Sequence, residues 1–554
     1  MKNYRLISIL QLIIILLFIS GCQNKSSEKS ARIICAINSD LVSLNPLFAF
    51  SDNEGNISEL LYASLVQHDW DDKKGDMETS PMLAKSWEWS RDSSSITINL
   101  RDDVKWSDGQ QFTANDVVFT FDAYSDPLVQ SKLYGTFKNF YVDSALHIDL
   151  KKTFIVKNPF GIIINFKKNS APTFYDIDFP IIPEHVFKNI YRKDLVTAEK
   201  ELKPVTDGAF SLFEWNKNQS LILKADKKSF LYKDGNVSEL IFKIVPDYNS
   251  ELTQLKKGEI DLMQDIKADD CTALLKINNL NIIAIKGREY DYAGWNNIDP
   301  DVYKKTKRAV PNKLFGNYEI RKALTFSINR GEIIKQFMDN HGEAADGPVS
   351  PIFKEAFNYD LQPLIYSPDS AKKLLTQAGW KDTDRNGTLK KNGREFSFTL
   401  SIPGGNPRRD FTAALIQNNL QAAGIKVIIE KLEPEVFFQK MFNRELDAWV
   451  AGWTVSIPLD LKSFWYSKLE DAPLNVVSYQ NKTIDELLEK IEISQNRDEK
   501  NVLYKKLQEV IYNDNPVTFL FWDDKLIAYN TRIHNINASP LGVFHNCRNW
   551  LTVK

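Results

Sequence analysis

Short segments of alternating polarity and capped amphipathic helices follow one another along this chain of 554 residues. Ile96, Ile98 and Leu100 alternate with polar residues, which is typical of a half-buried strand. Thr113 and Asp116 then form a near capping box, in which each side chain can hydrogen-bond to the backbone of the other residue. No internal repeat accompanies this pattern. The chain is therefore expected to be an α/β protein in which helices cover sheets.

The same pattern predicts further helices and strands in the second half of the chain, each bounded by a capping residue, a glycine or a proline. These elements are a helix capped by Ser367 and ended by Gly379, a helix over 411–423, a strand from Ile425, a helix capped by Thr483, a helix over 498–512 and a strand over 517–522.

The N-terminus carries two cations, Lys2 and Arg5, followed by an apolar run from Leu6 to Ile19. A bilayer-spanning helix needs roughly 20 apolar residues, so this run is predicted to be part of a signal peptide. The small residues directly before Cys22 resemble the bacterial lipobox. That resemblance implies a lipoprotein signal peptide over 1–21 and a diacylated Cys22; the alternative is a plain secretory signal with an incidental cysteine.

Residues 23–30 contain no apolar side chain, so 22–31 is expected to be a lipidated cysteine followed by a flexible leash. Removing residues 1–21 takes away Lys2 and Arg5 and changes the net charge from −2 to −4. Neither value indicates a nucleic-acid partner, which would require a clustered basic face. No later segment approaches about 18 consecutive apolar residues, so the rest of the chain is expected to lie in water, tethered at one end.

The other three cysteines, Cys35, Cys271 and Cys547, lack the spacing of metal ligands. Cys271 is expected to be a buried thiol. The region 382–393 begins like a calcium-binding loop, but Gly393 stands where a bidentate glutamate is needed, which favours a polar turn. The six histidines are scattered, and neither a nucleophile elbow nor a zinc-protease helix is present. No metal, no cofactor and no catalysis are therefore expected; a surface-tethered hydrolase and a sensory or chaperone role are the alternatives.

Several blocks occur in order along nearly the whole mature chain: PMLAKSW at 81–87, LRDDVKWSDG at 100–109, FTANDVVF at 112–119, DGAFSLFEW at 207–215, IVPD at 244–247, LKKGEID at 255–261, IRKALTFSINR at 320–330, GP at 347–348 and SPDSAKKLLTQAGW at 367–380. Together they resemble the family 5 extracellular solute-binding proteins, the oligopeptide- and dipeptide-binding lipoproteins of ABC importers.

This resemblance implies a periplasmic-binding-protein-like receptor with two lobes and an additional inserted domain, the three-domain arrangement of cluster C. Domain I would comprise 32–75, 200–287 and 512–554, domain II 76–199, and domain III 288–511. Domain III would close onto domain I about hinge strands near 284–296 and 512–525. Both ends of the mature chain would then share one domain, so a bridge between Cys35 and Cys547 is conceivable.

The segment 451–456 resembles the loop with which peptide receptors of this family hold their ligand, which makes Gly452, Trp453, Thr454 and Ser456 candidate binding residues. In those receptors an aspartate three residues after the tryptophan binds the peptide's amino terminus. Ser456 stands there instead and cannot neutralise an ammonium group. The ligand is therefore expected to be an oligopeptide whose charge is met elsewhere, or a non-peptide solute such as a metal chelate, haem, an opine or a sugar.

Further candidates lie on the expected hinge strands, because these border the cleft. They are Trp295 and Asn296 on the first strand and Phe519 and Phe521 on the second, with core packing as the alternative for each. Tyr134 is a candidate from domain II. The resemblance implies a monomeric, lipid-anchored receptor outside the cytoplasm of a bacterium, which binds a small solute or peptide and delivers it to an ABC permease.

Overall fold

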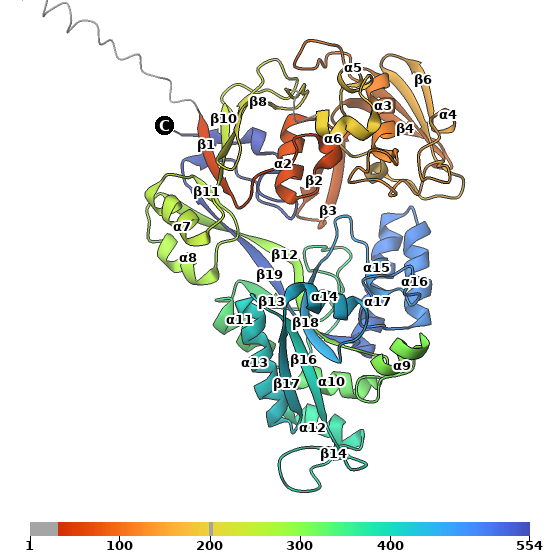
Figure 1. The fold of residues 1–554 in the computed structure, drawn as a ribbon, viewed down its shortest axis with the longest axis vertical. Coiled ribbons are helices and arrows are strands. Elements are labelled where there is room, and N and C mark those ends of the chain that lie inside the picture. The colour runs from red at the N-terminus through yellow and green to blue at the C-terminus, as the bar shows by residue number, and fades with distance from the viewer. Residues whose placement is uncertain (1–30, 199–202, 554) are drawn as a thin grey trace, which may run out of the picture.

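The computed structural model describes residues 31–198 and 203–553. The predicted signal peptide, Cys22 and the polar segment 23–30 lie outside these residues. The molecule has two lobes, an upper and a lower one in Figure 1, which are connected by the long strands β12 (Leu280–Trp295) and β19 (Val517–Asn530). In the parts of the chain described, no helix combines the length and apolarity needed to cross a membrane.

An 11-stranded mixed sheet runs through both lobes in the order β17-β16-β18-β12-β19-β11-β1-β10-β9-β8, with β13 paired to β19. β12 is antiparallel to both of its neighbours, whereas β1 lies parallel to β10 and β11. The remaining strands of this sheet are β1 (Arg32–Ile37), β8 (Phe210–Asn216), β9 (Ser220–Ala225), β10 (Glu239–Ile244), β11 (Leu262–Met263), β13 (Gly342–Ala344), β16 (Ser397–Pro403), β17 (Lys426–Leu432) and β18 (Ala448–Thr454).

The pairing of β12 with β19 is irregular at two places, between Ile285 and Glu289 and between Asp291 and Tyr292. Leu280 to Ile285 pair with Asn530 to Lys525, and pairing resumes at Glu289 opposite Asp523. Such a bulge bends the strand locally. Gly287 lies within it, where a Cβ atom would overlap the carbonyl group of Asp523. The two connections therefore form one strand pair, bent at a point that only glycine can occupy.

The upper lobe adds a four-stranded antiparallel sheet in the order β4-β5-β7-β6 and two short hairpins. Its further elements are β2 (Val66–Asp71), β3 (Asp76–Pro81), β4 (Ala84–Trp89), β5 (Ser95–Leu100), β6 (Phe154–Asn158), β7 (Gly161–Asn165), β20 (Ile533–His534), β21 (Leu551–Thr552), α2 (Asp52–Leu61), α3 (Ala114–Ser125), α4 (Leu150–Thr153), α5 (Glu184–Phe187), α6 (Leu195–Ala198), α7 (Tyr248–Lys257) and α8 (Ala268–Leu274).

The strand and the capped helix predicted in this lobe are confirmed. The alternating segment at Ile96 to Leu100 lies in β5, and α3 begins with the expected capping box, in which the Thr113 amide donates to the Asp116 carboxylate at 2.8 Å. One hydrophobic cluster extends from β1 through the four-stranded sheet to the C-terminal segment. The predicted boundary between domains I and II, at 75/76, falls in the turn between β2 and β3 and stays a prediction.

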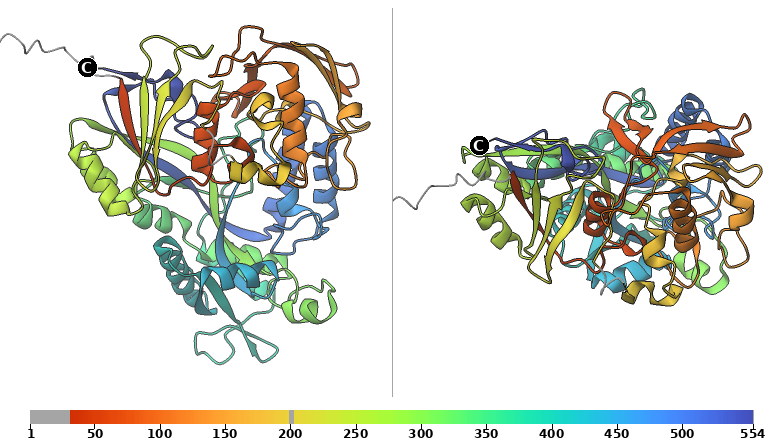
Figure 2. Two further views of the ribbon diagram at one scale, coloured as in Figure 1. Left: turned by 45° about the horizontal axis from the view of Figure 1, so that its top comes forward. Right: turned by 90° about the horizontal axis from the view of Figure 1, so that it is seen from above.

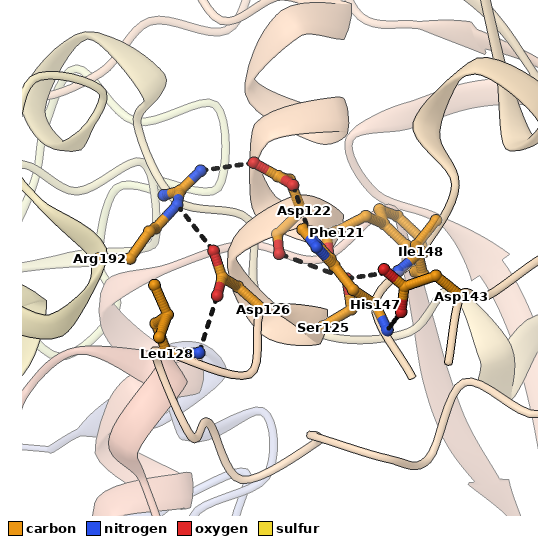
Figure 3. A network of polar contacts seen from close by, with 9 residues as sticks. All are labelled: Phe121, Asp122, Ser125, Asp126, Leu128, Asp143, His147, Ile148 and Arg192. Carbon is orange, nitrogen blue, oxygen red and sulfur yellow. Dashed lines mark hydrogen bonds and ion pairs between the residues drawn. The ribbon is translucent and has the colours of Figure 1, made fainter. Parts of the chain in front are cut away.

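A polar network fixes the end of α3 (Figure 3). Arg192 contacts both Asp122 and Asp126, at 2.5 and 3.5 Å, and the His147 ring lies 2.8 Å from the Asp122 carboxylate. The Ser125 hydroxyl donates to a carbonyl one turn earlier in α3 and accepts from the Ile148 amide. These contacts tie α3 to Arg192 and to the segment around His147, so the network has a structural role within the upper lobe.

The lower lobe packs helices against both faces of the sheet, over two separate hydrophobic clusters. Its elements are α9 (Pro300–Thr306), α10 (Tyr318–Ser327), α11 (Arg330–Phe337), α12 (Pro368–Gln377), β14 (Lys390–Lys391), β15 (Arg394–Glu395), α13 (Pro407–Ala422), α14 (Pro434–Phe442), α15 (Lys462–Trp465), α16 (Lys482–Ile493) and α17 (Arg497–Asp514).

Capping in this lobe follows the sequence with one exception. Ser367 caps α12, and Gly379 ends that region with a positive φ of 88°, as expected. The predicted cap at Thr483 is wrong. The Asn481 side chain accepts from the amides of Thr483 and Ile484, at 2.9 and 3.3 Å, so asparagine performs the capping and Thr483 lies inside the helix.

The three cysteines of the described residues are buried free thiols, so the bridge considered between Cys35 and Cys547 is not formed. Burial, and then the nearby Cys547, raises the pKa of the Cys35 thiol. The C-terminal segment lies beside β1 (Figure 2), where the Arg532 guanidinium donates to the carbonyl of Arg32 at 2.6 Å. Within 382–388, Asp382 accepts from two backbone amides of a polar turn.

Candidate functional site

A cavity of about 790 Å³ lies where β12 and β19 pass between the lobes. Its wall is formed by the end of β1, the start of α2, the bulge of β12, the facing part of β19 and the C-terminal loop. Thr454, at the end of β18, contributes from the lower lobe. The lining residues are 36–39, 49–53, 55, 56, 59, 132, 246, 248, 251, 264, 265, 285–289, 454, 523, 525, 527 and 539–543.

Charged groups of both signs line this cavity. Lys286, Arg288 and Lys525 stand on the connecting strands, and acidic side chains face them from several elements. Glu251 is one of these acids: burial, and then the neighbouring Asp265, raises its pKa to about 7. The cavity can therefore meet a solute that carries both positive and negative groups.

An arginine cluster supports the cavity from the lower lobe. Arg408 forms an ion pair with Asp523 and lies 3.3 Å from the buried carboxylate of Asp291, while Arg409 reaches the same carboxylate at 3.1 Å. Burial raises the pKa of Asp523 to about 6, although Arg408 opposes this shift. The cluster joins α13 to both connecting strands, so it fixes the strand pair on which the cavity is built.

Of the segment 451–456, Thr454 is the residue that lines the cavity. Gly452 lies opposite Asp291 in the pairing of β12 with β18, where a Cβ atom would overlap the Asp291 carboxylate. Glycine at position 452 therefore leaves room for the buried Asp291 carboxylate. This structural role explains the glycine without any contact to a ligand. The exposed side chain of Thr454 lines the cavity.

Trp453 is half-buried, and its indole N–H donates to the Tyr292 hydroxyl at 3.0 Å. Its ring lies 5.5 Å from the ring of Phe464. Ser456 accepts a hydrogen bond from the amide of Asp460 at 3.2 Å, and the Asp460 carboxylate accepts from the amide of Lys462. The loop after Trp453 is therefore ordered by its own polar groups.

The other predicted site residues lie outside the cavity lining. The Trp295 indole donates to Thr518, and Asn296 donates to two backbone carbonyls, that of Leu446 at 3.0 Å among them. Phe519 and Phe521 are 3% and 0% exposed, so their expected exposure to the cleft is not found. Helices cover both faces of these strands. The alternation of side chains along a strand therefore cannot show which face would open to the cleft. The Tyr134 hydroxyl donates to a carbonyl within the upper lobe.

Sequence reasoning missed the charged wall and the arginine cluster. One signal was available: Arg408 and Arg409 occupy the first turn of α13, where the helix dipole disfavours cations. Two consecutive arginines there indicate acidic partners elsewhere in the fold. Those partners are far away in sequence, so the signal does not identify them.

Two α/β lobes with a polar cavity beside the strands that connect them form an architecture suited to a solute-binding receptor. The family model described as bacterial extracellular solute-binding proteins, family 5, matches residues 78–473. The chain belongs to this family of receptors that serve ABC importers.

The relatives bind different solutes. The oligopeptide-binding protein AppA of Bacillus subtilis is 28% identical over 98% of both chains. Its structure with a nonapeptide covers 94% of this chain and 99% of its own, with a TM-score of 0.68. Heme-binding protein A of Haemophilus influenzae is 25% identical over 94% of this chain and 92% of its own. NikZ of Campylobacter jejuni, solved with nickel and histidine, shares the fold at 23% identity and a TM-score of 0.71, covering 94% of this chain and 100% of its own.

Proposed function

We propose that this protein captures oligopeptides between its lobes and delivers them to an ABC permease, without chemical turnover and without a cofactor. In this proposal domains I and III, with the boundaries predicted from the sequence, close on the ligand, and Cys22 anchors a monomeric receptor to a bacterial membrane. The cavity beside the strand pair is the observation that carries the proposal. Its volume lies within the range of about 300–1,000 Å³ that is common for ligand sites.

The charge of the cavity supports a zwitterionic ligand such as a peptide. Because Ser456 cannot neutralise an amino terminus, another carboxylate must do so. Glu251 and Asp265 suit this task, since they repel each other across the cavity wall and a cation between them would relieve that repulsion. Residues 452–456 would pair with the peptide backbone as an added strand.

Calorimetry with residues 23–554 tests this function. Peptides should bind without being cleaved, and Trp453→Ala should weaken binding without unfolding the chain, because the side chain is half-buried at the edge of its cluster. If the variant binds peptides with unaltered affinity, Trp453 is not a binding residue. Hydrolysis of the peptides would contradict a receptor role.

A non-peptide solute is the second candidate, and Ser456 is the observation that favours it. Relatives that carry haem or nickel–histidine show the breadth of ligands accepted by this fold. In the same calorimeter, haem and the nickel–histidine complex serve as probes. Binding of either one, with no peptide binding, would replace the oligopeptide proposal.

A further inference from the structure

The ends of several strands meet at one end of the large sheet, in the upper lobe. The Arg32 carbonyl, at the start of β1, accepts from Arg532, which follows β19. Arg532 also forms an ion pair with Asp261, just before β11, at 2.6 Å. Strand pairing brings the start of β10 and the end of β9 to the same place, because Glu239 lies opposite both Arg32 and Lys224. The described chain begins at this end of the sheet.

Two helices end at the same place. α7 is followed by Gly258, three residues before Asp261, and α8 is followed by a short segment that leads to the start of β12. The Thr531 amide donates to the Asn279 carbonyl at 2.9 Å, which joins that segment to the end of β19. Figure 1 shows α7, α8 and the start of β1 on one side of the upper lobe, and α12 at the far end of the lower lobe. We call the surface formed by 31–32, 226–239, 256–261, 274–280, 530–534 and 551–553 the tether end.

Exposed cations predominate on the tether end. Those that form no ion pair within residues 31–198 and 203–553 are Arg32, Lys227, Lys228, Lys233, Lys256, Lys257 and Lys276. The carboxylates on the same surface are Asp226, Asp234, Glu239 and Glu259, while Asp261 is neutralised by Arg532. The chain without residues 1–21 carries a net charge of −4, since loss of Lys2 and Arg5 lowers the value of −2 for the whole sequence. The tether end is therefore a basic surface on an acidic protein.

The position of this surface in the chain places it near the proposed anchor. Cys22 precedes Ala31 by nine residues, which span at most about 32 Å when fully extended. A lipid on Cys22 therefore holds the tether end closer to the membrane than any other part of the described chain. Cations near an anionic membrane surface strengthen binding by about fivefold each.

We infer that the tether end docks on the phosphate headgroups of anionic lipids in the membrane that holds Cys22. The inference rests on the lipid anchor of the proposed function. Two exposed apolar side chains stand among the cations: Leu275 adjoins Lys276, and the Val553 amide donates to the Arg532 carbonyl at 3.0 Å. Such side chains add apolar contact at the boundary between headgroups and acyl chains. All of these residues belong to the upper lobe, so docking leaves the lower lobe free to move.

The test is co-sedimentation of residues 23–554 with vesicles of equal parts phosphatidylglycerol and phosphatidylcholine, and with vesicles of phosphatidylcholine alone. At about 0.05 M salt the protein should bind the anionic vesicles and not the neutral ones. Binding should be lost at about 0.5 M salt, because screening then confines the attraction to about 4 Å. The variant that combines Lys227→Gln, Lys228→Gln and Lys276→Gln should bind the anionic vesicles at least about tenfold more weakly.

The matched control combines Lys372→Gln, Lys373→Gln and Lys381→Gln. These lysines are also exposed and form no ion pair within the described chain, and they lie in and just after α12, far from the tether end. The control should bind the anionic vesicles like the native protein, and both variants should keep the native affinity for peptides in calorimetry. Equal weakening in the two variants, or no binding of the native protein to anionic vesicles, overturns the docking surface and leaves the peptide receptor standing.

The anchor is tested separately by the mass of the protein extracted from bacterial membranes. Acyl chains on Cys22, together with vesicle binding that depends on the three lysines of the tether end, support the inference. A chain without acyl groups overturns both the anchor and the docking surface that rests on it.

Discussion

Gly452 shows how a residue of the candidate binding segment 451–456 can be required by the fold. Its Cα–H faces Asp291, whose carboxylate is fully buried and paired with two arginines. Side-chain atoms at this position would collide with the Asp291 carboxylate and with the Arg409 guanidinium. The residue thus connects the binding segment to the arginine cluster.

Gly452→Ala is expected to lower the free energy of unfolding by about 1–3 kcal/mol, because the added methyl group overlaps the Asp291 carboxylate. Chemical denaturation measures this change. Gly331→Ala is the matched control, since its Cβ atom would have only one neighbour, 3.7 Å away. Equal stability of Gly452→Ala and the native protein would show that Asp291 and its arginines shift at little energetic cost to accommodate the methyl group.

Glu251 predicts a pH dependence of binding. Burial and Asp265 raise its pKa to about 7, so its carboxylate gains charge as the pH rises through that value. The affinity for a peptide with a free amino terminus should therefore increase from about pH 6 to about pH 7, below the range in which the amino terminus itself loses its proton. Calorimetry at both pH values measures this, with an N-acetylated peptide as the control.

Asp523 contributes in the same direction at lower pH, since its pKa is raised to about 6. Glu251→Gln separates the two groups: it should flatten the dependence near pH 7 and leave that near pH 6. If the pH dependence of affinity is the same in Glu251→Gln as in the native protein, a carboxylate other than Glu251 binds the amino terminus of the peptide.

At the scale of elements, the hairpin of β2 and β3 forms a second contact between the lobes. The Glu355 amide donates to the carbonyl of Lys74 at 3.1 Å, and Lys354 donates to the carbonyl of Asp72. Arg497, at the start of α17, lies 3.0 Å from Asp76 and 3.1 Å from Glu355. The hairpin thereby holds the upper lobe against the lower one, apart from the connecting strands.

Gly75 makes this contact possible. It has a positive φ of 66°, and a Cβ atom there would overlap the backbone of the segment after Ser350. Gly75→Ala should separate the lobes at this point and raise the radius of gyration of the ligand-free protein in solution scattering. Gly235→Ala is the matched control, because Gly235 also has a positive φ but no neighbour within 4 Å. Identical scattering of the two variants would contradict the role of the hairpin.

The same scale shows what the sequence could predict. Periodicity and capping residues identify β5, α3 and α12, because these signals are local. The cap of α16 was misjudged because Asn481 and Thr483 are both good capping residues, and the pattern cannot choose between them. The binding segment was found through its resemblance to known receptors, whereas the burial of Trp295 and Phe521 depends on helices that cover both faces of their strands.

At the scale of the whole molecule, the cavity is assembled from parts that are distant in sequence. Lys132, Glu251 and Asp523 reach one wall because the chain crosses between the lobes twice, through β12 and β19. No local sequence pattern indicates which distant residues come together in the cavity. The proposed capture of a solute requires the two lobes to move about this one bent strand pair.

The central claim is that a peptide fills the cleft between the lobes. The most direct measurement is affinity selection: a random peptide library is equilibrated with residues 23–554, and the bound fraction is identified by mass spectrometry. Intact peptides should be retained by the native protein, and fewer of them by Trp453→Ala. A native protein that retains no peptide, but does retain haem or nickel–histidine offered in the same mixture, would contradict it.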